Sequence, residues 1–139
     1  MLKIEHLTKV YSNDKKAVDD LSLIVEPGDI YGFIGANGAG KTSTIKSIVG
    51  IHDFDKGEIY ICGHSIRKEP LLCKKKMAFL PDNPDLYKNL TARQFLDFVA
   101  DIYRVSLEKR QAAIEKYSKM FELATSLDQL ISAYSHGLK

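Results

Sequence analysis

The sequence lacks tryptophan, contains only two cysteines and has no apolar stretch that approaches the length of a membrane span. Cys62 and Cys73 lie in no metal-ligand spacing. We expect no secretory leader, because residues 1–5 are charged and patterned like a strand. We therefore expect a cytoplasmic protein in a reducing environment, and any membrane role would have to come through a partner.

A strong charge of either sign is also missing. The sequence has 20 Lys and Arg against 18 Asp and Glu, a net charge of +2, so no global field favours nucleic acid or a lipid surface. We expect no nucleic-acid partner. With 45% hydrophobic and 27% charged residues in a chain of 139, the composition is that of one ordinary globular domain with a real core.

Residues 35–42 carry the strongest motif, because they fit the P-loop pattern G-x-x-x-x-G-K-[ST] at every fixed position. They lie between an apolar run at 30–34 and a helical pattern that ends at Gly50. The glycines let successive backbone N–H groups point at one phosphate, and the helix adds the positive end of its dipole. Lys41 would reach the outer phosphate oxygens, and the Thr42 hydroxyl would hold Mg²⁺. A chance glycine-rich turn is the alternative, and the context on both sides argues against it.

The apolar patterns predict a sheet in the first part of the chain. Residues 2–10 and 17–25 are predicted to be an antiparallel pair, 30–34 a buried central strand that leads into the P-loop, and 58–62 and 77–80 further strands. Two prolines interrupt the chain after residue 80 and predict a functional loop there. Residues 64–73 give no clear pattern.

The last third of the chain is helical in pattern. Thr91 is expected to cap a helix with one apolar face, and residues 107–121 predict a second amphipathic helix. Because no strand separates these helices, we place them in a helical subdomain appended to the sheet. Residues 127–134 give no clear prediction.

The order of these parts resembles the ATP-binding-cassette (ABC) ATPases over essentially the whole chain. Tyr11 lies 30 residues before Lys41, where that family places an aromatic residue that stacks on adenine. Without the resemblance, Tyr11 would be only a tyrosine at the end of a strand. The family's own version of the P-loop implies nucleotide contacts from Gly35, Ala36, Asn37, Gly38, Ala39, Gly40, Lys41, Thr42 and Ser43.

Two further matches are imperfect. Asp82 stands where the family has a glutamine that senses the metal and the γ-phosphate; an aspartate can still bind Mg²⁺ and act in catalysis with Lys41, or it can simply cap a turn beside Pro81. Ser135, His136 and Gly137 are similar to the family's signature sequence, with histidine in place of its first glycine. The resemblance implies that this segment faces the γ-phosphate of ATP held by a second copy, whereas a surface helix start is the alternative.

The resemblance implies an α/β fold: a P-loop NTPase core with an N-terminal antiparallel β subdomain over residues 1–90 and a helical subdomain over 91–139, which together form an incomplete ABC ATPase domain. It implies an exporter-type ATP-binding subunit that uses ATP and Mg²⁺. It further implies that such a subunit forms a head-to-tail dimer and lies peripherally on the inner face of the cell membrane, where residues 83–91 are expected to meet a separate permease. The cargo is not encoded in these residues.

The family's water-activating glutamate belongs to a later strand than this chain contains. We therefore expect the 139 residues to bind ATP without appreciable turnover, and the full-length protein to hydrolyse it. Two alternatives stay open: a soluble ABC ATPase that acts on a ribosome or nucleic-acid complex, and a nucleotide-binding module without turnover.

Overall fold

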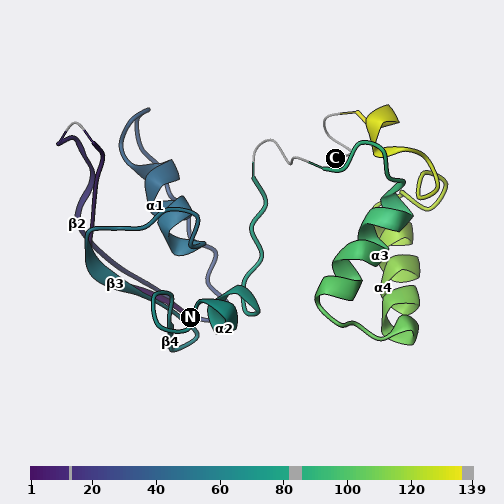
Figure 1. The fold of residues 1–139 in the computed structure, drawn as a ribbon, viewed down its shortest axis with the longest axis horizontal. Coiled ribbons are helices and arrows are strands. Elements are labelled where there is room, and N and C mark those ends of the chain that lie inside the picture. The colour runs from purple at the N-terminus through teal and green to yellow at the C-terminus, as the bar shows by residue number, and fades with distance from the viewer. Residues whose placement is uncertain (13, 82–85, 136–139) are drawn as a thin grey trace. The chain divides into compact units, whose positions relative to one another are not determined.

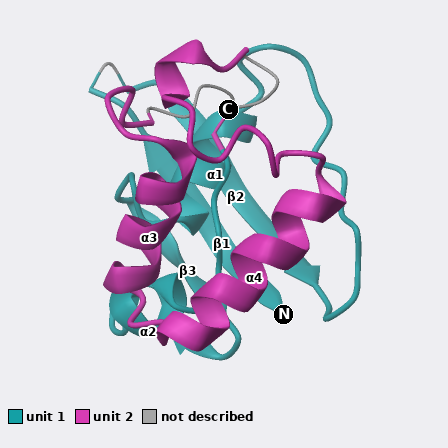
Figure 2. Ribbon diagram, turned by 90° about the vertical axis from the view of Figure 1, so that its right-hand side faces the viewer, with its two compact units in different colours: residues 1–80 teal, residues 81–139 magenta. Residues whose placement is uncertain are grey.

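The chain forms two compact units, residues 1–80 and 81–139, which Figures 1 and 2 show. The computed structural model describes residues 1–12, 14–81 and 86–135. The first unit contains β1 (Leu2–Val10), β2 (Lys16–Val25), α1 (Lys41–Ile48), β3 (Lys56–Ile61), β4 (His64–Ser65) and α2 (Pro70–Lys74). The second contains α3 (Ala92–Ile102), α4 (Leu107–Met120) and the 3-10 turn η1 (Ile131–Ala133).

The sheet of the first unit is antiparallel, with the strand order β2-β1-β3-β4. Strand β1 is central, since Leu2 pairs with Val25 of β2 on one side and with Ile61 of β3 on the other. The predicted antiparallel pair at 2–10 and 17–25 and the predicted strand at 58–62 are confirmed. The segment without a clear pattern, 64–73, contains β4 and most of α2.

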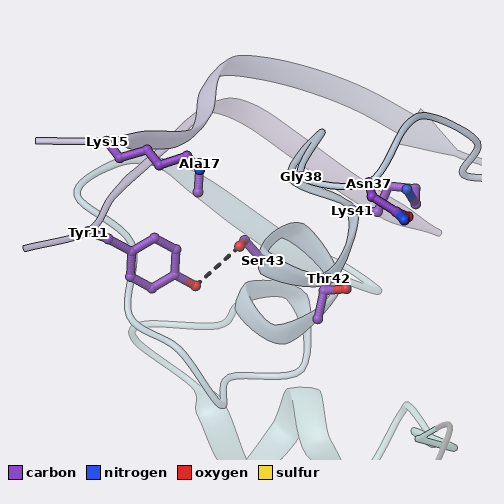
Figure 3. Close-up of a pocket in the computed structure, with 9 residues that line it drawn as sticks. Tyr11, Lys15, Ala17, Asn37, Gly38, Lys41, Thr42 and Ser43 are labelled. Carbon is purple, nitrogen blue, oxygen red and sulfur yellow. Dashed lines mark hydrogen bonds between the residues drawn. The ribbon is translucent and has the colours of Figure 1, made fainter. Parts of the chain in front are cut away.

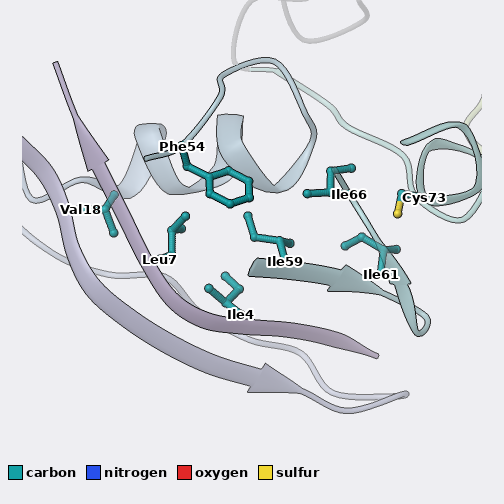
Figure 4. Close-up of a cluster of buried hydrophobic side chains, with 8 residues drawn as sticks. All are labelled: Ile4, Leu7, Val18, Phe54, Ile59, Ile61, Ile66 and Cys73. Carbon is teal, nitrogen blue, oxygen red and sulfur yellow. The ribbon is translucent and has the colours of Figure 1, made fainter. Parts of the chain in front are cut away.

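One face of this sheet carries the core of the first unit (Figure 4). Period-two alternation places Ile59 and Ile61 of β3 on this face, and Ile48 of α1 packs against it. Helix α1 therefore begins at the P-loop and ends on the core. The buried cluster consists of Ile4, Leu7, Val18, Phe54, Ile59, Ile61, Ile66 and Cys73.

The predicted strands at 30–34 and 77–80 are wrong for this structure. Both segments are irregular, and most of their side chains are exposed: Ile30 is 102% exposed, Ile34 94% and Leu80 85%, although Met77 packs against the core. A strand needs a neighbour to accept its hydrogen bonds. Within residues 1–12, 14–81 and 86–135, no strand pairs with either segment, so apolar character alone did not make them strands.

The second unit consists of two successive helices and the segments that pack on them. Arg110, in the first turn of α4, donates hydrogen bonds to Asp97 at the middle and Asp101 in the last turn of α3, which joins the helices near their connection. Thr91 caps α3 as predicted: its hydroxyl accepts from the Gln94 N–H, and the Gln94 side chain accepts from the Thr91 N–H.

Residues 86–91 also belong to the second unit. The Ile131 N–H donates to the Leu90 carbonyl at 2.9 Å, and the Tyr87 ring lies 5.7 Å from that of Phe98. The chain therefore divides at residue 80, ten residues before the boundary that the sequence suggested. In the part of the chain that the structure describes, no helix combines the length and apolar character needed to cross a bilayer.

Candidate functional site

The P-loop ends where α1 begins. Gly40 is the residue before α1 and has a left-handed backbone, with φ at 88°. A Cβ atom placed there would lie 2.1 Å from the carbonyl oxygen of Ala17 in β2. Only glycine fits this approach, which holds the start of α1 against β2. The backbone N–H groups of the first helical turn have no partner within the helix and are free to bind an anion.

Lys41 folds back over its own loop. Its Nζ donates to the carbonyl oxygens of Gly35 at 2.6 Å and Ala36 at 2.8 Å. An ammonium group has three N–H donors, so two of them hold the loop. This arrangement places a positive charge beside the first turn of α1.

A pocket of about 310 Å³ opens beside this loop, within the size range of small-ligand sites (Figure 3). The P-loop forms one wall, and the end of β1, the following turn and the start of β2 form the other. Among the described residues, two lysines and no carboxylate line it, so its charge suits a phosphate. Its lining residues are Tyr11, Lys15, Ala17, Asn37, Gly38, Gly40, Lys41, Thr42 and Ser43.

The Tyr11 side chain is held in this pocket by its hydroxyl group. Tyr11 Oη lies 3.1 Å from Ser43 Oγ, in the first turn of α1, and 3.1 Å from His52 Nδ1, beyond the end of α1. The backbone N–H of Tyr11 donates to the Lys15 carbonyl at 3.1 Å, which closes the turn between β1 and β2. The ring therefore has a fixed place opposite the P-loop.

The structure brings most of the predicted nucleotide-binding residues into one pocket. Gly35 and Ala36 contribute carbonyls to Lys41, and the Ala39 N–H closes a turn on the Ala36 carbonyl at 3.2 Å. Sequence reasoning missed Lys15 and Ala17. The hairpin could have indicated both, because a short turn after Tyr11 returns the chain to the same end of the sheet.

Four further predicted residues belong to other parts of the chain. Ser135 lies in the second unit, exposed, directly after buried Tyr134. Asp82, His136 and Gly137 lie outside the described residues. Burial raises the pKa of the Tyr134 hydroxyl, and that hydroxyl donates to the Ser126 carbonyl.

The donor set suits a magnesium ion bound together with a phosphate rather than a metal bound by protein alone. Among the residues that the structure describes, no three His, Cys, Asp or Glu side chains form a metal site. Thr42 offers an exposed hydroxyl at the mouth of the phosphate loop. Mg²⁺ prefers oxygen ligands and commonly takes one or two from protein and the rest from phosphate and water.

Comparison with known proteins shows the family to which this chain belongs. A family model described as ABC transporter matches residues 18–139. The chain belongs to the ABC transporter family. It is similar to the human ATP-binding cassette sub-family A member 2, at 37% identity over 100% of this chain and 6% of that protein. It is also similar to the bacitracin transport ATP-binding protein BcrA of Bacillus licheniformis, at 35% identity over 100% of this chain and 44% of that protein.

Solved structures of ABC proteins share its fold. The ATP-binding subunit of an ABC transporter aligns with a TM-score of 0.90 at 28% identity, over 99% of this chain and 57% of its own. A dimeric ATP-binding cassette bound to ADP and Pi aligns with a TM-score of 0.82 at 22% identity, over 99% of this chain and 65% of its own. At this identity the likeness shows the fold alone. The present ABC chain spans roughly half the length of its bacterial relatives. The predicted fold class, an ABC-type P-loop NTPase, is confirmed.

Proposed function

We propose that this chain is the ATP-binding part of an ABC transporter subunit and that the pocket beside Lys41 binds Mg-ATP. The observation that carries the proposal is the pocket in which the Tyr11 ring stands opposite the P-loop. An aromatic ring and a phosphate loop facing one cavity suit a ligand with a flat base at one end and phosphates at the other.

In this proposal the phosphate end is held by this chain's own groups. The first-turn N–H groups of α1 and the Lys41 ammonium bind phosphate oxygens, and Thr42 holds the magnesium ion. Asp82 is the second proposed metal ligand, a role that rests on the family resemblance. When bound, Mg²⁺ would supply positive charge that neutralises charge on the phosphate oxygens.

The relatives support a role in transport. BcrA is named as a bacitracin transport protein, and SkfE of Bacillus subtilis, 33% identical over 100% of this chain, as a peptide export protein. We propose that the complete protein hydrolyses ATP to drive an exporter-type permease at the inner face of the cell membrane. Leu86, Tyr87 and Leu90 are the proposed apolar anchors within the 83–91 contact.

The proposal also includes a second copy. Ser135, His136 and Gly137 of one copy would complete the ATP site of the other in a head-to-tail dimer. The dimeric cassette bound to ADP and Pi, which shares this fold, supports dimer formation by analogy.

The direct test is calorimetric titration of MgATP into the chain and into Lys41→Ala. Because one charge-assisted contact is lost, affinity should fall about 10- to 100-fold, or roughly 1.5–3 kcal/mol. Lys75→Ala removes an exposed lysine outside the pocket and serves as the matched control. Equal affinity in the parent chain and Lys41→Ala would overturn the assignment of the phosphate site.

A further inference from the structure

The Tyr11 hydroxyl joins the two ends of α1. Its partners are Ser43 Oγ at 3.1 Å, in the first turn, and His52 Nδ1 at 3.1 Å, four residues beyond the last helical residue. We infer that His52 is a positioning residue that holds the Tyr11 ring as the base-binding wall of the pocket. This inference rests on the proposed ATP-binding function and assigns a role to a residue outside the pocket lining.

His52 is anchored well enough to position another side chain. Its backbone N–H donates to the Lys46 carbonyl at 3.1 Å, and the Ile51 N–H donates to the same oxygen at 2.9 Å. The loop after α1 is thereby tied to the last turn of the helix. The imidazole is partly buried and meets the Tyr11 ring edge-on, with centroids 6.1 Å apart and planes at 86°.

The hydrogen bonds among the three side chains are mutually compatible. With Ser43 O–H donating to the Tyr11 oxygen and Tyr11 O–H donating to Nδ1 of neutral His52, each of the three contacting atoms has a partner. The hydroxyl contacts fix the far end of a ring whose residue is 38% exposed. A ring held before the ligand arrives loses less conformational freedom on binding.

A lysine also lies near the Tyr11 ring: Lys9 Nζ is 5.4 Å from the ring centroid. Lys9 adds attraction to the ring but no directional bond. The directional contacts come from Ser43 and His52, and of these only His52 lies outside the P-loop helix.

In this geometry different residues bind the phosphates and the base of the ligand. Lys41 acts on phosphate oxygens, whereas His52 acts through Tyr11 on the base. A change at His52 should therefore weaken binding of ATP but leave binding of inorganic tripolyphosphate, which has no base, unchanged. A general destabilisation of the fold would weaken binding of both ATP and tripolyphosphate.

The experiment measures binding of MgATP and of magnesium tripolyphosphate by calorimetry, using the full chain. His52→Leu should weaken MgATP binding about 2- to 10-fold, the effect of one hydrogen bond. Tyr11→Phe also removes the Ser43 contact, so it should weaken MgATP binding at least as much, and neither variant should change tripolyphosphate binding. The double variant should be no weaker than the weaker single variant, because both remove the same contact. His52→Asn places a polar atom near the Nδ1 position and should restore most of the affinity.

His64→Leu is the matched control, since His64 is a half-buried histidine whose Nδ1 lies 3.2 Å from Glu69 rather than near Tyr11. The inference is overturned if His52→Leu weakens both ligands equally, if it weakens neither, or if the two single effects add in the double variant. Failure of the parent chain to bind MgATP overturns the proposed function as well. Normal ATP binding with a silent His52→Leu overturns only the role of His52.

Discussion

Arg93 donates two hydrogen bonds to the carboxylate of Asp128: Nε donates to Oδ1 at 2.7 Å, and one terminal nitrogen donates to Oδ2 at 3.2 Å. The pair joins the first turn of α3 to the segment after α4, 35 residues along the chain. The Arg93 N–H also donates to the Leu127 carbonyl at 2.9 Å, so side chain and backbone hold the same junction. The hydrogen bond to Arg93 lowers the pKa of Asp128, and the same bond raises the pKa of Arg93.

This pair predicts an acid-sensitive junction. Because the pKa of Asp128 is lower in the folded chain than in the unfolded one, its stabilisation is complete above the ordinary aspartate value of about 4. It is lost as the pH falls through the folded value. Asp128→Asn should unfold at lower urea concentration than the parent at pH 7 and lose less on acidification. Glu122→Gln is the control at an exposed carboxylate, and equal pH profiles for Asp128→Asn and the parent would contradict this account.

The N-caps of α3 and α4 offer a matched comparison. Thr91 makes a reciprocal capping box with Gln94, whereas the Ser106 side chain makes no cap hydrogen bond to α4. Thr91→Ala should therefore lower the free energy of unfolding by about 1 kcal/mol, and Ser106→Ala by clearly less. Denaturant unfolding of the three proteins measures the difference, and losses of similar size would show that the capping box adds nothing.

Substitutions at Gly40 and Gly38 allow the cost of a steric clash to be compared with the cost of backbone strain alone. Both have a left-handed backbone, with φ at 88° and 83°, but of the two only Gly40 has another atom within 4 Å of an added Cβ. Gly38→Ala should cost about 1–2 kcal/mol of stability from strain alone. Gly40→Ala should cost about 1–3 kcal/mol more, because its methyl group overlaps the Ala17 carbonyl. Thermal and denaturant unfolding give both values, and equal losses would argue against close contact between β2 and the start of α1.

Turnover should be absent from the isolated chain. Among the described residues that line the pocket there is no carboxylate to activate water. We expect MgATP binding with no phosphate release above the Lys41→Ala background. Phosphate release that disappears in Lys41→Ala would mean that a base outside the pocket lining reaches the bound nucleotide, and Asp82→Asn would be the next variant to measure.

Local patterns were sufficient for part of this structure. The P-loop, the α1 stop at Gly50, where φ is 68°, and the Thr91 cap all follow from short-range chemistry that the sequence states directly. Strands at 30–34 and 77–80 did not follow, because a strand depends on a partner that periodicity cannot identify. The role of His52 could not be predicted for a similar reason: its contact with Tyr11 spans 41 residues and depends on the hydrogen bonds that hold the loop after α1.

A ligand that binds Lys41 must compete with the carbonyl oxygens of the P-loop, to which the Lys41 ammonium already donates hydrogen bonds. Two of its three N–H donors have neutral carbonyl partners, so at those two donors an incoming group gains only the difference between its own oxygens and those of the loop. A neutral polar molecule offers no such difference and cannot displace them. Oxygens that carry full negative charge make stronger bonds to the same donor. We therefore expect the loop carbonyls to compete with incoming ligands, so that the site prefers polyphosphates to neutral metabolites of similar size.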